Sequence, residues 1–224
     1  MSEDVKNVWL KLFANTKQTL KKVEEVKSAV TAFNTNVDAV LKISGKRLEQ
    51  LIANQKLSLQ DLQDIKQTKL LNPEDVVKGI FKCFCNGIAE EWLSEEKAVY
   101  DWMMNNLGYD RLQMGGQGGI VANVLGILGV NKVKAHTNSL PKEQAEQFLK
   151  LDNIVSYDEN GQEKPAYQIN RRQDVPMIHW IIEFDKGDKV VVEGKEFVCP
   201  KANRFIATYD PLNLRLVFDE NFVR

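Results

Sequence analysis

Two stretches of this 224-residue sequence carry residue types suited to recognising a small polar ligand. The first is the cluster Asn34-Thr35-Asn36-Val37-Asp38, which ends a short β-prone run from Ser28 to Phe33. Amides beside a carboxylate supply the paired donors and acceptors that bidentate recognition of hydroxyl groups requires. The same residues would also serve as an Asx-rich cap for a following helix, and both interpretations stay open at this point.

The second stretch is the glycine-rich segment Met114-Gly115-Gly116-Gln117-Gly118-Gly119. It lacks the GK[ST] of a phosphate-binding P-loop, and it does not fit a dinucleotide fingerprint because its spacing is GGxGG and no predicted strand directly precedes it. Its glycines would let a ligand approach backbone N–H groups at a helix start, while Gln117 adds an amide donor and acceptor. The alternative is a tight turn whose glycines only let a helix pack against a sheet.

The remaining candidates are weaker. Glu90-Glu91-Trp92 is a short acidic cluster, and His179 stands alone on an apolar strand, where a histidine is more often a core or edge residue than a ligand contact. Cys83 and Cys85 lie two apart on a predicted helix, so they point to different sides, and Cys199 is distant in sequence. We expect three buried or half-buried thiols in a reducing compartment.

Composition excludes several classes of partner. Since 43% of its residues are hydrophobic, the chain can build a core. It has 30 basic and 31 acidic side chains, and so no basic excess for binding nucleic acid or anionic membranes. The N-terminus has no apolar signal-peptide core, and no apolar run approaches the roughly 20 residues that span a bilayer. The sequence predicts a cytoplasmic protein without nucleic-acid or membrane partners.

The elements that must position these residues begin with a helix. The apolar spacing over residues 5–26 predicts an amphipathic helix, followed by the strand at 28–33. Residues 44–112 are predicted as several short helices, one of which begins at Asn72-Pro73, where asparagine can cap and proline can occupy the first position.

The predicted elements change in the second half of the chain. Residues 114–136 predict a glycine turn, a small-residue helix and a strand from Lys132 to His136, and Pro141 opens another helix, which together is an α/β pattern. From Ala166 onward the runs MIHWIIEF, KVVVEGKEFVCP with a Glu193-Gly194 turn, RFIATY and LRLVF predict an antiparallel sheet.

Several of these stretches, in order along the chain, resemble the ADP-dependent sugar kinases, the glucokinases and phosphofructokinases best known from archaea. The stretches are TAFNTNVDAV, NGIAEEW, MGGQGGIVANVLGILGVNKVKAHTNSLPKEQAEQFL, IHWIIEFDKG and ANRFIATYD, and the resemblance runs from about residue 30 to residue 224. The MGGQ-GI-AN helix and the NRFI strand are specific as a pair, whereas NxNxDA alone occurs in many sugar kinases.

The resemblance implies a ribokinase-like α/β fold. We expect a partial large α/β domain, formed by residues 1–35, 115–177 and 208–224, and a discontinuous α+β lid with an antiparallel sheet, formed by residues 36–114 and 178–207. The sugar would bind between the two, with ADP rather than ATP as phosphoryl donor.

The resemblance also implies which residues contact the sugar, with Glu90 as the one-residue alternative to Glu91. They are Asn36, Asp38, Glu91, Gly116, Gln117 and His179. Arg204, with Arg171 and Arg172 nearby in sequence, could reach an anionic sugar phosphate by bidentate pairing; the alternative is that Arg204 only extends over the lid surface.

The chain departs from the family at its catalytic centre. The family's base is an aspartate in a GxGD motif near the C-terminus, and no GxGD occurs here, so we expect no catalytic residue in this chain. Asn160-Gly161-Gln162-Glu163 has the letters of the family's metal-organising NxxE motif but lies in a polar turn, so we expect no metal site there. The Mg²⁺ and ADP sites are expected mostly in a missing C-terminal half, and the chain alone is expected to be inactive.

Three functional hypotheses remain. The first is the sugar-binding portion of an ADP-dependent glucokinase, which makes glucose 6-phosphate in glycolysis; His179 and the KANRFI stretch favour this branch. The second is the same portion of an ADP-dependent phosphofructokinase acting on fructose 6-phosphate, and the third is a non-catalytic sugar-binding or interaction fragment. A separate C-terminal half or self-association are the expected protein partners, because an interrupted sheet leaves an apolar edge and uncovered helix faces.

Overall fold

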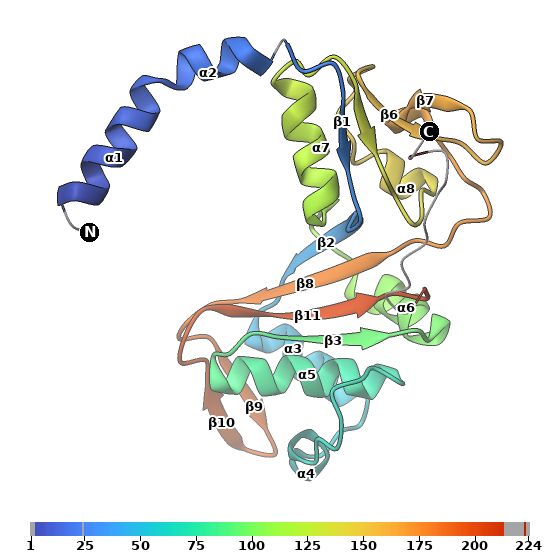
Figure 1. Ribbon diagram of the computed structural model, residues 1–224. Helices are drawn as coiled ribbons and strands as arrows, with labels where there is room; N and C mark the ends of the chain where they lie inside the picture. The colour runs from blue at the N-terminus through green and yellow to red at the C-terminus, as the bar shows by residue number, and fades with distance from the viewer. Residues whose placement is uncertain (1–2, 24, 213–221, 223–224) are drawn as a thin grey trace. The chain divides into compact units, whose positions relative to one another are not determined.

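The computed structural model describes residues 3–23, 25–212 and 222, and the chain forms two units (Figure 1). Unit 1 comprises Met1–Thr35, Gly116–Asp174 and Val217–Arg224, and unit 2 comprises Asn36–Gly115 and Val175–Leu216. The boundary expected at 208 is wrong, because it falls inside strand β11 (Asn203–Tyr209). That strand is paired on both edges in unit 2, so the chain cannot leave the sheet at that point.

Unit 1 is built on a four-stranded sheet in the order β1-β5-β6-β7. Strands β1 (Ala29–Thr31), β5 (Val133–Ala135) and β6 (Ile154–Tyr157) are parallel, and β7 (Glu163–Pro165) is antiparallel to β6. The expected strand, small-residue helix and second strand are thereby confirmed: helix α7 (Gln117–Ile127) leads into β5, and the short helix α8 (Lys142–Ala145) begins after Pro141. A short 3-10 helix (Ala166–Gln168) follows β7.

Helix α7 approaches the sheet of unit 1 through its small residues. A Cβ at Gly126 would lie 2.6 Å from the side chain of Ile154, so only glycine allows this closeness. The outward face of α7 is apolar too, with Val124 47% and Ile127 67% exposed. Because a helix that is apolar all round is normally covered, this outward face is an uncovered apolar surface of unit 1.

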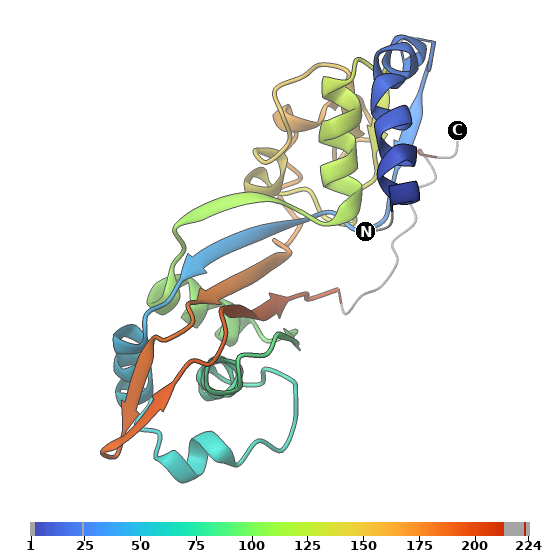
Figure 2. The ribbon, with the colours of Figure 1, turned by 90° about the vertical axis from the view of Figure 1, so that its left-hand side faces the viewer.

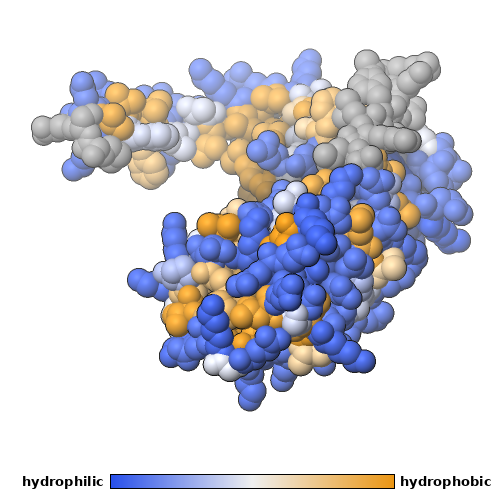
Figure 3. All heavy atoms as spheres, turned by 90° about the horizontal axis from the view of Figure 1, so that it is seen from below, coloured by the Kyte–Doolittle hydropathy of each residue, from blue (hydrophilic) through white to orange (hydrophobic). Residues whose placement is uncertain are grey.

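The N-terminal segment forms two helices where one was expected. Helix α1 (Glu3–Ala14) and helix α2 (Thr16–Val23) are separated at Asn15, so the prediction of a single helix over 5–26 is wrong. The apolar side chains of α1 are exposed, Trp9 to 64% and Phe13 to 80%, and they gather along this segment in the space-filling view (Figure 3).

Unit 2 contains a five-stranded sheet in the order β3-β11-β8-β2-β4. The strands not yet bounded are β2 (Asn36–Lys42), β3 (Glu90–Ser94), β4 (Arg111–Gly115) and β8 (Ile178–Phe184). Two neighbouring pairs are antiparallel, β8 with β11 and β2 with β4. The other two pairs are parallel, β2 with β8 and β3 with β11. The expected antiparallel sheet is therefore corrected to a mixed one, since long connections through helices permit parallel neighbours.

Two sequence predictions for this part of unit 2 have definite outcomes. Strands β9 (Lys189–Val192) and β10 (Lys195–Val198) form a separate hairpin, and Glu193 and Gly194 at its turn both have positive φ, as a two-residue hairpin turn requires. Strand β2 contains Asn36 and Asp38, so the interpretation of this stretch as a helix cap is wrong. The LRLVF run at 214–218 lies outside the described residues.

The helices of unit 2 are α3 (Gly45–Asn54), α4 (Leu59–Gln63), α5 (Pro73–Asn86) and α6 (Lys97–Trp102), followed by a π-helical turn (Met103–Leu107). The start predicted for α5 is confirmed: Asn72 accepts a hydrogen bond from the Asp75 N–H at 3.0 Å, with Pro73 in the first position. The region 44–112 is not wholly helical, because it contains β3 and β4. Among the described residues, no helix is long and apolar enough to cross a membrane.

The core of unit 2 lies between the sheet and these helices (Figures 1 and 2). Alternation along each strand sends Trp180 and Phe205 to this face, where they are fully buried. Phe205 meets Trp92 edge to face with ring centroids 5.4 Å apart, and each such buried aromatic stabilises the fold by about 1.5–3 kcal/mol. The same alternation sends the intervening residues to the opposite face of the sheet.

The three cysteines are free thiols, two buried and Cys85 half-buried, which confirms the expectation from their spacing. Burial raises the pKa of the Cys83 and Cys85 thiols to about 12. At pH 8 we expect iodoacetamide to alkylate both on the order of 10³-fold more slowly in the native chain than in the urea-unfolded chain, because thiolate is the nucleophile. Mass spectrometry of quenched time points measures both rates, and native rates within tenfold of the unfolded ones would contradict this expectation.

Candidate functional site

Four polar side chains lie in one row across the unit 2 sheet, on the face opposite the helices. Strand pairing places Gln113 of β4 beside Asp38 of β2, Asp38 beside His179 of β8, and His179 beside Thr208 of β11. Directly opposed residues have Cβ atoms about 5 Å apart, so this polar row is continuous across four strands. The polar row, together with Asn36, Glu91 and Arg204, is called the polar face below.

Asp38 is the centre of one half of the polar face. Its Oδ1 accepts a hydrogen bond from Asn36 Nδ2 at 3.0 Å, and Asn36 is buried with 1% exposure. Partial burial raises the pKa of Asp38, while nearby His179 and the side-chain hydrogen bonds from Asn36 and Gln113 oppose the rise. Within the described part of the chain, Asn36 Oδ1 has no hydrogen-bond partner. This pair therefore presents the Asp38 carboxylate as an acceptor, oriented by the buried Asn36 amide.

Gly115 makes room for this pair. It is the last residue of β4 and lies opposite Asn36 in the strand register. A Cβ at Gly115 would collide with the Asp38 carboxylate and the Asn36 amide. One glycine of the MGGQGG segment therefore serves the polar face directly, which goes beyond the turn proposed from sequence.

Glu91 and His179 form the other half of the polar face. Glu91 lies on edge strand β3, and its Oε1 accepts a hydrogen bond from Thr208 Oγ1 at 2.7 Å. Burial lowers the pKa of His179, and the nearby charges of Glu91, Asp38 and Asp210 oppose that effect. A lowered pKa favours the neutral imidazole, which presents one donor and one acceptor nitrogen.

The structure separates Glu90 from Glu91. Glu90 points to the other side of β3, where its carboxylate lies 2.7 Å from Lys82 Nζ and accepts a hydrogen bond from Trp92 Nε1 at 2.8 Å. Glu91 alone of the two lies on the polar face, and its contact with the sugar stays a prediction.

Arg204 and Arg171 belong to different units of the chain. Arg204 of β11 is exposed on the polar face, opposite Glu183 of β8 and four residues from Thr208, a distance of about 13 Å along the strand. Arg171 belongs to unit 1, where its Nε donates to the Tyr157 carbonyl at 2.8 Å. Arg171 is thus held by the backbone of its own unit.

Gly116 and Gln117 begin helix α7 of unit 1. Gly116 has φ of +73° at the N-cap position, a conformation that favours glycine, and Gln117 is exposed at the first helical position. The prediction that no strand directly precedes the glycine segment is wrong, because β4 ends at Gly115. The five-residue alternation of RLQMG was too short to distinguish from the surrounding helices, and the GGxGG spacing still does not match a dinucleotide fingerprint.

Sequence reasoning missed Thr208, Gln113 and Asp210, a buried residue just after β11. The alternation in RFIATYD would have placed Thr208 and Asp210 on the face of Arg204 once that residue was a candidate. Gln113 sits in the polar row through β4, a strand the sequence did not reveal.

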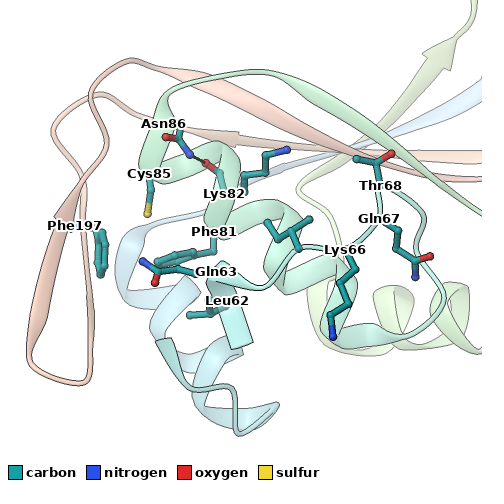
Figure 4. Close-up of a pocket in the computed structure, with 11 residues that line it drawn as sticks. Leu62, Gln63, Lys66, Gln67, Thr68, Phe81, Lys82, Cys85, Asn86 and Phe197 are labelled. Atoms are coloured by element: carbon teal, nitrogen blue, oxygen red, sulfur yellow. Dashed lines mark hydrogen bonds between the residues drawn. The ribbon is translucent and has the colours of Figure 1, made fainter. Parts of the chain in front are cut away.

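A cavity of about 630 Å³ lies on the helical side of the unit 2 sheet, away from the polar face (Figure 4). It is lined by residues of α4, α5 and β10, including Phe81 and Phe197, whose ring centroids are 5.2 Å apart. Its lysines are already paired, Lys82 with Glu90 and Lys66 with Asp64. None of the candidate residues lines it, so its size alone does not make it the site.

The described residues do not fit a divalent cation. Among them, no group of three or more His, Cys, Asp or Glu side chains is placed to hold a metal ion. Glu163 of the NxxE letters lies in β7 and pairs with Lys132, its Oε1 2.6 Å from Nζ. The hydrogen-bonding groups of the polar face instead suit a neutral polyhydroxyl ligand.

Comparison with known proteins gives the family. Residues 27–224 match the model of the ADP-specific phosphofructokinase/glucokinase conserved region. The chain is 31% identical over 212 residues to the ADP-specific phosphofructokinase of Methanosarcina acetivorans, covering 93% of this chain and 43% of that protein. It is 33% identical over 218 residues to the ADP-dependent glucose/glucosamine kinase of Pyrococcus furiosus, covering 96% of this chain and 47% of that protein.

The fold agrees with these similarities. A hypothetical ADP-dependent phosphofructokinase from Pyrococcus horikoshii superposes with a TM-score of 0.75 at 28% identity, over 89% of this chain and 45% of that structure. The chain spans less than half the length of the relatives it matches. The continuous match, the shared α/β fold and the sequence identity show that the chain belongs to the ADP-specific phosphofructokinase/glucokinase family.

Proposed function

We propose that the polar face binds the sugar substrate of an ADP-dependent hexose kinase, with glucose as the substrate and glucose 6-phosphate as the product. The observation that carries this proposal is the polar face, where His179 lies between two carboxylates, Asp38 and Glu91, each of which accepts a hydrogen bond from a neighbour. The named activities of the relatives support a sugar kinase.

The chemistry of a hexose suits this arrangement. Its hydroxyl groups each donate and accept, so carboxylates, an amide oxygen and a neutral imidazole can fix the ring from several directions. Half-buried Ile181 and Ile206 lie beside the polar row and offer an apolar surface to the ring C–H groups. Because phosphoryl transfer depends mainly on positioning and charge neutralisation, holding one hydroxyl in a fixed direction is a catalytic contribution.

The remaining sugar contacts and the donor site are part of the same proposal. Gly116 and Gln117 are proposed to contact the sugar from the start of α7, with unit 1 as part of the large α/β domain and unit 2 as the lid. ADP is the proposed phosphoryl donor, and no described residue is assigned to ADP, Mg²⁺ or the general base. We expect this chain alone to show no ADP-dependent sugar phosphorylation.

Fructose 6-phosphate is the second candidate substrate, for the phosphofructokinase branch of the family. Arg204 favours it, because an exposed guanidinium on the polar face can pair with a phosphate in a bidentate way. The proposed choice of glucose rests on His179, whose donor and acceptor nitrogens serve hydroxyl groups without a phosphate.

Isothermal titration calorimetry of the 224-residue chain with each sugar tests the choice. We expect His179→Ala to weaken glucose binding about tenfold, the effect of one lost hydrogen bond, and to weaken fructose 6-phosphate binding less. Arg204→Ala should affect only fructose 6-phosphate, and Lys186→Ala, an exposed charge beyond β8, should affect neither. Equal losses for both sugars in His179→Ala would contradict the assignment to glucose.

A further inference from the structure

Thr208 is a buried hydroxyl in the middle of the polar row. It lies on β11, between β8 and β3, opposite His179 on one side and Leu93 on the other, and only 1% of it is exposed. Its Oγ1 donates to Glu91 Oε1 at 2.7 Å, a short distance typical of a hydrogen bond to a charged oxygen. A threonine side chain has few χ1 choices in a strand, so this donor has a fixed direction.

Glu91 needs such a partner because of its place in the sheet. It lies on edge strand β3 and its own cross-strand neighbour is Ile206, so the hydrogen bond to Thr208 runs diagonally between adjacent strands. An exposed glutamate has about 2 kcal/mol of side-chain entropy to lose on being fixed. A carboxylate already held in the free protein has lost part of that freedom before a ligand arrives.

The hydrogen bond also leaves part of Glu91 available. Thr208 contacts Oε1, and no other described residue donates to Oε2, which stays accessible to a ligand hydroxyl. On the other side of His179, Asn36 Nδ2 likewise donates to one oxygen of Asp38, Oδ1. The polar face thus carries two carboxylates, each held by neutral donors from an adjacent or the same strand.

We propose that Thr208 is a positioning residue that fixes the Glu91 carboxylate for sugar binding, an inference that rests on the proposed function above. Thr208 acts through Glu91 and does not contact the sugar. Its removal should therefore weaken sugar binding only while Glu91 is present.

A double-mutant cycle tests this role by calorimetric titration of glucose into the 224-residue chain. We expect Thr208→Val, which keeps the shape and removes the donor, to weaken binding about tenfold. Thr208→Ser, which keeps the donor, should stay within twofold of the parent chain. In a Glu91→Ala background, Thr208→Val should change binding by less than twofold.

Controls separate this role from a purely structural one. Ser156→Ala removes a buried hydroxyl of unit 1 that donates to the Ala135 carbonyl, and it should leave glucose affinity unchanged. Thermal melting establishes that each variant is folded, and Thr208→Ala carries the test if the valine variant is not.

The outcomes distinguish the two proposals. Parent-like glucose binding by the folded Thr208→Val and Thr208→Ala variants, or an equal loss with and without Glu91, would overturn the positioning role while leaving the proposed function standing. A parent chain that binds neither glucose nor fructose 6-phosphate would overturn the proposed function and the positioning role together.

Discussion

Replacing Asp38 with asparagine is expected to weaken glucose binding at least about 100-fold while leaving unit 2 folded. The carboxylate lies in the polar row between Gln113 and His179 and is oriented by Asn36. Hydrogen bonds to a charged acceptor are worth about 1.5–3 kcal/mol each, so losing two to a bound sugar corresponds to a factor of 100 or more. Asparagine keeps the size and one oxygen but presents an NH₂ where a hydroxyl would donate.

The same substitution is expected to leave the melting temperature equal or higher at pH 7. Burial raises the pKa of Asp38, so the folded state binds a proton more readily than the unfolded state does. Asp38 therefore stabilises the folded state at pH values below its unfolded pKa. This stabilisation is lost as the pH rises through the raised folded pKa, so at neutral pH the ionised carboxylate is unfavourable in the folded state. A neutral asparagine removes that cost.

Calorimetric titration and thermal melting at pH 7 measure both effects of Asp38→Asn. Asp64→Asn removes an exposed carboxylate of unit 2 and should change neither glucose affinity nor melting temperature appreciably. Glucose binding by Asp38→Asn within tenfold of the parent chain would argue that Asp38 does not contact the sugar.

Replacing Gly45 with alanine is expected to lower the free energy of unfolding of unit 2 by about 2–4 kcal/mol. Gly45 is the first residue of α3, and its N–H donates to Asp188 Oδ2 at 2.7 Å. A Cβ there would collide with the backbone carbonyl of Lys189, at the start of β9, which cannot move aside as a side chain can. The loss is a large fraction of the 5–15 kcal/mol that stabilises a typical domain.

The sign of the Gly45→Ala effect makes the test sharp. Helix propensity alone would favour alanine by about 1 kcal/mol, so destabilisation would come from the contact with Lys189 and from disturbance of the Gly45 N–H bond to Asp188. Urea unfolding followed by circular dichroism measures the change, and Lys46→Ala, at the next and exposed position of α3, should stay within about 0.5 kcal/mol of the parent chain. A variant as stable as the parent chain would contradict the close packing of α3 on the β9–β10 hairpin.

The sequence predicted the elements with strong periodicity or strong end signals. Helix α5 has an asparagine cap and a proline at its start, and β8 alternates over seven residues. Strand β3 was missed because only Trp92 and Ser94 of EEWLS are buried, a pattern too short to outweigh helical neighbours. The parallel pairs of the unit 2 sheet were missed because local patterns carry no information on which distant strands meet.

The residues of the candidate site also divide into those that motifs revealed and those that only the structure revealed. Asn36, Asp38, Glu91 and His179 were found through motifs, and the structure brings these four onto one face of unit 2. Thr208 was not found, because a threonine in RFIATYD is an ordinary strand residue and its partner Glu91 is 117 positions away. Gly115 belonged to a recognised motif, but the collision it avoids depends on the pairing of β4 with β2.

The most direct test of the central claim is to titrate glucose into the ¹⁵N-labelled 224-residue chain and map the amide chemical-shift changes. Binding at the polar face predicts saturable shifts at Asp38, His179 and Thr208, with the residues that line the α4–α5 cavity, such as Phe81, unaffected. Unchanged spectra at saturating glucose, or shifts confined to that cavity, would contradict the claim that the polar row binds the sugar.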